Sequence, residues 1–248
     1  MANPFYVEGG QRGEKVNDLF AKVAPRYDLI NDLQSFGLHR LWKRRVIRMA
    51  NVQPGERALD VCCGTGDIAF ALAKANAEVT AVDFSEAMLA VARGRQGSAD
   101  FHSLPGGAER GRTGIRFQQG DAMQLAFPDN SFDVVTVGYG LRNLSSWEQG
   151  LREMHRVARP GARLLVLDFG KPDNALLRSL YFAYLRLIVP VFGKLFCGDS
   201  ATHAYILESL RHYPAQLGVA DAMQRLGCRD VRVVNLIGGA MSINFGVK

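Results

Sequence analysis

A glycine-rich turn follows the first buried strand that the sequence predicts. The apolar run Ala58–Val61 is typical of a buried parallel strand, and it breaks at Gly64-Thr65-Gly66. Glycine at positions 64 and 66 lets the backbone turn sharply and approach a ligand, because no Cβ stands in the way. The helix pattern that follows would present free backbone N–H groups to an anionic group. The turn therefore predicts a nucleotide-type cofactor site at the carboxyl end of a strand.

Three acidic residues indicate which cofactor this is, since the glycine spacing also satisfies the loose dinucleotide fingerprint. Asp60 lies in the first strand, where it would meet a cationic amino group. Asp83 ends the next strand and is placed for ribose hydroxyls, and Asp121 follows a third strand, where an acceptor would meet an adenine amine. These partners, in this order, describe S-adenosylmethionine. The alternative for each aspartate alone is a turn former or a helix cap.

Composition narrows the class of protein. A chain of 248 residues with 48% hydrophobic and 22% charged residues is typical of one soluble enzyme domain with a large core. The net charge of +6 permits nucleic acid, acidic ligands or an anionic membrane surface, and selects none of them. The cysteines show no C-x-x-C spacing, so no metal site is predicted. Residues 1–13 lack the apolar core of a signal peptide, and we expect a cytoplasmic protein.

Strand and helix patterns alternate from residue 57 onward, which predicts an α/β fold with a doubly wound, mostly parallel sheet. The predicted strands end near Cys62 and Asp83 and cover residues 115–119, 132–138 and 163–168. Residues 94–114 read as a long inserted loop. Two last strands, 231–237 and 240–245, are joined at Gly238-Gly239 by a predicted two-residue turn. This antiparallel hairpin is typical of the seven-stranded methyltransferase sheet.

Two helical additions accompany this single predicted domain, residues 1–248. Residues 1–53 form an N-terminal helical cap, whose basic third helix, 38–50, either lies on an anionic bilayer or packs on the sheet; packing is favoured. Residues 172–217 form an apolar helical insertion. Arg186, Pro190 and Lys194 interrupt its apolar run, so a membrane span is rejected. A lid over a hydrophobic substrate that also contacts lipid is favoured over a buried helix.

Several motifs make the chain resemble the ubiquinone and menaquinone C-methyltransferase family, whose fold is the class I S-adenosylmethionine-dependent methyltransferase fold. They are Val23–Asp32, Cys63–Asp67, Phe127–Asp133 and Gly140–Asn143. Residues 196–200 and 202–216 are similar to the cyanobacterial and plastid branch, which methylates demethylphylloquinone. The long 94–114 loop and Asp121-Ala122, where many members have Asn-Ala, depart from the family. We expect the loop to be neutral and Asp121 to keep the adenine contact.

The resemblance implies site residues and partners. Cofactor contacts carry over to Thr65, Asp83, Asp121, Ala122 and Gly138, in addition to Asp60, Gly64 and Gly66 from the turn itself. Tyr27, Arg142 and Asn143 carry over as candidate catalytic residues around the methylated ring. The implied partner is a lipophilic quinol, with transient contact to a membrane surface, plastid-type in a eukaryote. No nucleic-acid partner is expected, and a homodimer is left open.

The chemistry favours the reduced substrate. A quinone ring carbon and a sulfonium methyl are both electron-poor, so the acceptor must be the quinol, whose phenolate pushes electron density onto carbon. Phenols have a pKa near about 10, so deprotonation needs help. Arg142 stays protonated and is assigned to stabilising negative charge, directly or by polarising a water; Tyr27 and Asn143 would orient the oxygens. His203 and His212 are candidates to take the proton, since histidine titrates near physiological pH, but a surface or structural role is favoured for each.

Three other interpretations stay open. An RNA methyltransferase would need an aromatic and basic stacking surface, which the sequence lacks. A nicotinamide-dependent oxidoreductase is the second. The third, within the family, is that the acceptor is demethylmenaquinol or a ubiquinone precursor, since an apolar lid would discriminate only weakly between prenyl tails.

Overall fold

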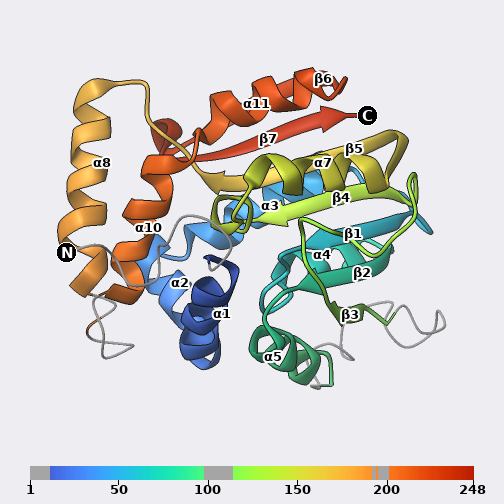
Figure 1. The fold of residues 1–248 in the computed structure, drawn as a ribbon, viewed down its shortest axis with the longest axis horizontal. Coiled ribbons are helices and arrows are strands. Elements are labelled where there is room, and N and C mark those ends of the chain that lie inside the picture. Colours follow the sequence, from blue (N-terminus) through green and yellow to red (C-terminus); the bar gives the residue numbers. More distant parts are fainter. Residues whose placement is uncertain (1–11, 98–113, 192–193, 195–200) are drawn as a thin grey trace.

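A computed structural model describes residues 12–97, 114–191, 194 and 201–248, with the side chains of 201–204 left aside. Its centre is a seven-stranded sheet in the order β3-β2-β1-β4-β5-β7-β6 (Figure 1). The strands are β1 Arg57–Val61, β2 Glu78–Asp83, β3 Arg116–Gln119, β4 Phe132–Gly138, β5 Ala158–Phe169, β6 Arg229–Leu236 and β7 Met241–Val247. Only β7 runs antiparallel, to both β5 and β6. The predicted mostly parallel sheet with a C-terminal hairpin is confirmed.

Helices cover both faces of this sheet, because successive strand residues point to opposite sides. In β4, Val134 packs with α3 and α4, whereas the next residue, Val135, packs with α7 and α11. The helices are α1 Arg12–Val23, α2 Tyr27–Ser35, α3 Leu38–Ala50, α4 Asp67–Lys74, α5 Glu86–Gln96, α7 Trp147–Val157, α8 Ala175–Leu187, α10 Ala201–His212 and α11 Ala215–Arg225. Two apolar layers therefore hold the sheet between them.

Some boundaries differ from the prediction. The β6–β7 connection is not a two-residue turn: Ile237–Gly239 form a 3₁₀ turn in which all three residues have positive φ. Helix α5 continues through Gly94 to Gln96, so the predicted loop begins later, and its residues 98–113 lie outside the described part of the chain. Strand β5 begins at Ala158, five residues before the predicted strand 163–168, and ends one residue after it.

The N-terminal cap is built from α1, α2 and α3. Helix α3 packs on the sheet through Val46 and Ala50, which are fully buried, while its arginines 40, 44, 45 and 48 stay exposed. Helices α1, α2, α8 and α10 gather beside the carboxyl ends of the parallel strands (Figure 1). In this fold class, ligands bind at that edge of the sheet. None of the described helices is long and apolar enough to cross a membrane.

Two glycines allow a direct test of the packing. A Cβ at Gly170 would lie 2.2 Å from the carbonyl oxygen of Gly239, whereas a Cβ at Gly94, inside α5, meets nothing within 4 Å. Gly170→Ala should lower the free energy of unfolding by about 1–3 kcal/mol, because backbone must shift. Gly94→Ala should raise it by about 0.5–1 kcal/mol, through lower entropy of the unfolded chain. Urea unfolding of both variants measures this, and equal effects of the two would contradict the packing described.

Candidate active site

The first of two cavities lies at the carboxyl ends of β1, β2 and β4 and has a volume of about 290 Å³. Helix α1 contributes to its lining through Val16, Asn17 and Phe20. The predicted cofactor residues in its lining are Gly64, Asp83, Asp121, Ala122 and Gly138. The structure therefore brings together residues that are up to 74 positions apart in the sequence and that were predicted to share one site.

The glycine-rich turn Gly64-Thr65-Gly66, called the elbow below, is hydrogen-bonded to Asp83. The backbone N–H of Gly64, at φ +56°, donates to Asp83 Oδ2 at 2.7 Å, and the N–H of Ser85 donates to Oδ1 at 2.9 Å. Burial raises the pKa of Asp83, and these backbone donors oppose that rise. Each carboxylate oxygen keeps a second lone pair. The carboxylate is therefore fixed in place and still able to accept from ribose hydroxyls.

The rest of the cavity also suits a nucleotide. Gly138 lines the cavity at the end of β4, and a Cβ there would lie 2.6 Å from Ile68 Cδ1, so glycine lets this strand end pack closely against α4. Asp121 Oδ1 accepts from the N–H of Met123 at 2.8 Å, which orients the carboxylate beside Ala122 and leaves further lone pairs for an adenine amine. The donor and acceptor set thus fits S-adenosylmethionine.

Asp60, Thr65 and Gly66 lie outside the lining of this cavity, contrary to expectation. The Asp60 carboxylate is buried and accepts from Thr136 Oγ1 at 2.7 Å; burial raises its pKa to about 7. Asp60 lies beside Thr136 of the neighbouring strand β4, with which it pairs in the sheet, whereas Asp83 is the last residue of β2. Gly66, at φ +89°, caps α4. Asp60, Thr65 and Gly66 therefore contribute to the structure of the turn and the strand before it, and not to the cavity lining.

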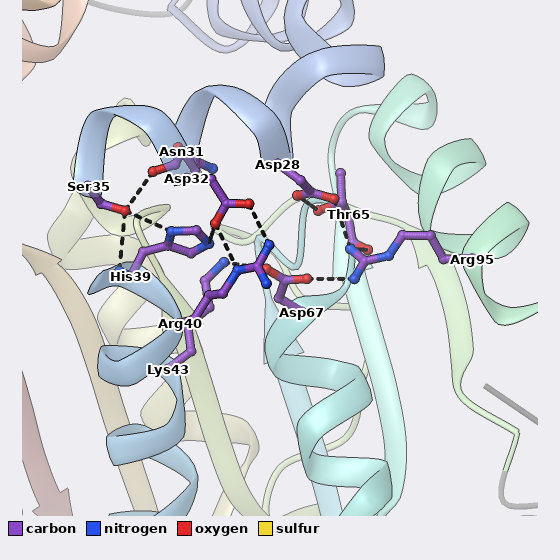
Figure 2. Close-up of polar contacts among 10 residues, drawn as sticks. All are labelled: Asp28, Asn31, Asp32, Ser35, His39, Arg40, Lys43, Thr65, Asp67 and Arg95. Carbon is purple, nitrogen blue, oxygen red and sulfur yellow. Dashed lines mark hydrogen bonds and ion pairs between the residues drawn. The ribbon is translucent and has the colours of Figure 1, made fainter. Parts of the chain in front are cut away.

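Thr65 joins the elbow to the N-terminal cap. Its hydroxyl donates to Asp28 Oδ1 of α2 at 2.7 Å (Figure 2). Arg95 of α5 donates to the Thr65 carbonyl at 2.9 Å and pairs with both Asp28 and Asp67, and Lys43 of α3 pairs with Asp67 at 2.6 Å. The elbow is therefore held by charges from three helices.

The second cavity has the same volume, about 290 Å³, and its lining is mostly apolar and aromatic. Helices α1, α2, α3, α8 and α10 all contribute to it, and Arg142 lies in its wall. Phe20, Tyr27 and Tyr139 line both cavities, so they form the wall that the two share. A methyl donor in the first cavity would therefore adjoin an apolar acceptor in the second.

Arg142 is fixed rather than mobile. Its Nε lies 3.2 Å from Asp168 Oδ1, both side chains are buried, and its guanidinium stacks over Phe169 at 4.6 Å from the ring centroid. Burial raises the pKa of Asp168, and the charge of Arg142 opposes that rise. Asp168 was not predicted as a site residue, although it ends the predicted strand 163–168, which is the same signal that indicated Asp83. The arginine supplies a positive charge of fixed position.

Asn143 takes a supporting role instead of the expected contact with the acceptor. Its Oδ1 accepts from Arg142 and, at 2.6 Å, from Tyr205 Oη, while its Nδ2 donates to the Tyr139 carbonyl at 3.1 Å. These bonds occupy the amide, which lines the cofactor cavity and not the apolar one.

The apolar cavity contains polar atoms that the sequence analysis did not anticipate. Besides Arg142 Nε, which is ion-paired with Asp168, four buried atoms of its lining residues have no hydrogen-bond partner within the described structure: Asn31 Nδ2, Gln34 Nε2, Tyr139 Oη and Tyr181 Oη. Buried polar atoms normally find partners, so these are available to the oxygens of an otherwise apolar ligand. Tyr139 had a detectable signal, since it follows Gly138 at the end of β4.

Of the two histidines considered as proton acceptors, His212 can be placed relative to the cavities. His212 lies 3.5 Å from Glu208 on α10, half-exposed, and lines neither cavity. The side chain of His203 falls outside the described residues.

The ribose assignment of Asp83 gives a binding prediction. Asp83→Asn replaces one acceptor oxygen by a donor, and should weaken S-adenosylhomocysteine binding by about 10–100-fold, because hydrogen bonds to a charged group are worth about 1.5–3 kcal/mol. Isothermal titration measures the loss. The matched control is Asp221→Asn on the exposed surface of α11, which should bind as the parent does. Unchanged affinity in Asp83→Asn would remove the assignment.

Comparison with known proteins agrees with this geometry. Residues 9–248 match the ubiE/COQ5 methyltransferase family. The ubiquinone/menaquinone biosynthesis C-methyltransferase UbiE of Azotobacter vinelandii is 42% identical over 246 residues, covering 98% of this chain and 93% of that protein. The demethylmenaquinone methyltransferase of Listeria monocytogenes is 39% identical over 238 residues, covering 95% and 96%.

A solved structure shows the same fold at low sequence identity. Magnesium protoporphyrin IX methyltransferase from Synechocystis, with bound S-adenosylhomocysteine, gives a TM-score of 0.64 at 19% identity and covers 94% of this chain and 98% of its own. The family match spans nearly all of the chain, including both cavities. The chain therefore belongs to the ubiE/COQ5 methyltransferase family and is an S-adenosylmethionine-dependent methyltransferase.

Proposed function

We propose that the enzyme methylates a ring carbon of a reduced, demethylated prenyl-naphthoquinone. The observation that carries the proposal is the apolar cavity, which shares Phe20, Tyr27 and Tyr139 with the cofactor cavity and has unpartnered polar atoms in its wall. A ring with two oxygens and a greasy tail matches such a lining. The names of the two relatives have menaquinone in common, which supports a naphthoquinol acceptor.

The tail of the acceptor is a finer question. The phytyl-tailed substrate, demethylphylloquinol, stays our expectation from the likeness of residues 196–216 to the phylloquinone branch. Residues 196–200 lie outside the described structure, and the names of the relatives given above do not mention phylloquinone. Demethylmenaquinol or a ubiquinone precursor is the alternative, because the ring and not the tail meets the polar atoms.

The residues of the site suit attack by a quinol carbon. The bound cofactor supplies an activated methyl group, so the protein has to orient the ring, exclude water and stabilise the phenolate. Arg142, held by Asp168, places a permanent positive charge in the cavity wall. Burial raises the pKa of Tyr27 to about 12, so its hydroxyl keeps its proton and can donate to a ring oxygen.

We further propose that the enzyme is cytoplasmic and contacts a membrane surface at the opening of the apolar cavity. Phe36 and Ile237 line the cavity and are nevertheless 82% and 52% exposed. Helix α8, which also lines it, exposes Leu176, Leu180 and Leu187, and α3 adds exposed arginines. Apolar side chains with nearby basic groups are typical of surfaces that bind anionic lipid. A tailed quinol could then pass from bilayer to cavity without crossing water.

A methylation assay tests the acceptor. With radiolabelled S-adenosylmethionine, label should enter a demethylated prenyl-naphthoquinone only when a reductant is present, because the oxidised ring cannot supply electrons. Phytyl- and prenyl-tailed acceptors in competition measure tail selectivity, and RNA serves as the unrelated acceptor. Equal labelling of the oxidised ring, or label on oxygen instead of carbon, would contradict the proposal.

Membrane contact is tested at the exposed aromatic residue. Phe36→Asn should weaken co-sedimentation with anionic phospholipid vesicles by about tenfold, since burying a phenylalanine is worth about 1.5–3 kcal/mol. Asparagine tolerates the left-handed backbone of this position, φ 50°, so the fold is kept. The control is Leu217→Asn, at a leucine of α11 that is 62% exposed and lines neither cavity. Equal losses in both variants would refute a specific docking face.

A further inference from the structure

We propose that His39 accepts the proton that the quinol hydroxyl loses when the ring is methylated. This inference rests on the proposed function. His39 is buried in the wall of the apolar cavity, at the first turn of α3. Its place in the sequence carries no motif that would mark it, so only the fold reveals it.

The other titratable groups of the cavity are poor bases. Among the described lining residues, Arg142 stays protonated. The remaining ones are tyrosines, and burial raises the pKa of each: Tyr27, Tyr139, Tyr181, Tyr184 and Tyr205. A tyrosine would have to ionise first to accept a proton. Of the described side chains that line the cavity, the imidazole alone titrates near neutral pH.

Hydrogen bonds determine which ring nitrogen is free. The Ser35 hydroxyl donates its single hydrogen to the Asn31 carbonyl at 2.6 Å (Figure 2). It can then only accept at the other contacts, from the His39 backbone N–H at 3.3 Å and from His39 Nδ1 at 2.8 Å. The neutral ring therefore carries its hydrogen on Nδ1 and keeps the lone pair on Nε2.

A carboxylate stands ready to stabilise the protonated ring. His39 Nε2 lies 3.6 Å from Asp32 Oδ1, and Arg40 holds Asp32 from the other side with a two-pronged contact (Figure 2). Asp32 is one turn of α2 before Ser35, so one helix presents both partners of the ring. A proton arriving at Nε2 gains the attraction of Asp32, whereas the neutral ring does not.

The surrounding charges keep the ring neutral at rest. Burial lowers the pKa of His39 first, and the charges of Lys43 and Arg40 on its own helix lower it further. Asp32 of α2 and Asp67 of α4 oppose this. The net pKa lies below the ordinary value of 6.5, so the basic form is the populated one at neutral pH.

The proton balance of the reaction is then complete. The O–H bond of the quinol breaks, its electron pair stays on oxygen, and the proton goes to His39 Nε2. The ring carbon forms a bond to the methyl group as the sulfur–methyl bond breaks, and that electron pair stays on sulfur. Loss of the ring C–H proton to solvent restores the aromatic ring as a phenolate, which takes the proton back from His39. One proton is released per turnover.

The test compares His39→Asn with the parent and with His212→Asn, the half-exposed histidine outside both cavities. In the parent and the control, kcat/KM should rise with pH through a midpoint below 6.5. His39→Asn should lose that limb and about 10²–10⁴-fold in kcat, while S-adenosylhomocysteine binds as before. An acceptor with electron-withdrawing ring substituents, whose phenol is more acidic, should recover part of the rate in His39→Asn.

A second experiment observes the His39 ring directly, without turnover. Nitrogen-15 NMR of histidine-labelled protein should show the Nδ1–H tautomer of His39. Asp32→Asn should lower the pKa of His39 and move the kcat/KM limb in the same direction. Retention of the limb in His39→Asn with more than a tenth of the parent rate would overturn the assignment while the proposed function stands. Failure of the parent to methylate any reduced acceptor would overturn both.

Discussion

The buried ion pair between Arg142 and Asp168 holds the two additions of this enzyme to its sheet. Asp168 is the next-to-last residue of β5, and Arg142 follows β4 in the short helix Leu141–Asn143. A buried charge is costly unless it is paired, so each requires the other. Around the pair, Arg12 of α1 donates to the Arg142 carbonyl at 2.7 Å, and the guanidinium contacts Ser209 of α10 at 3.3 Å. The cap and the insertion thus both contact one residue, Arg142.

The same pair gives the apolar cavity its chemistry. A cavity with aromatic walls would bind a greasy ring without reacting with it, because nothing would favour a negative oxygen. Arg142 provides that preference, and Asp168 keeps the guanidinium in one orientation. Oriented charge in a site that excludes water is worth more than the same charge in solvent. The stability of the fold and the stabilisation of a phenolate therefore depend on one interaction.

The sequence could predict the sheet and most of the cofactor cavity, because both follow from local rules. Buried strands are short apolar runs, and acids at their carboxyl ends, such as Asp83 and Asp121, collect at one edge. The rule failed at Asp60, which lies inside its strand and faces Thr136. The same rule could not identify His39 or Tyr181 as cavity residues, because their place in the cavity depends on how α3 and α8 dock against distant elements. No periodicity encodes such docking.

Tyr139 shows what the division into two cavities costs and provides. Its backbone has φ +62°, a conformation that costs a side-chain-bearing residue on the order of 1–3 kcal/mol. Glycine would relax that strain, yet it would remove the ring that stands between the two cavities and leave a window there. Water and small nucleophiles in the apolar cavity would then reach the sulfonium of the bound cofactor and consume its methyl group. The backbone strain at Tyr139 is thus the cost of keeping a ring between the methyl donor and the contents of the apolar cavity.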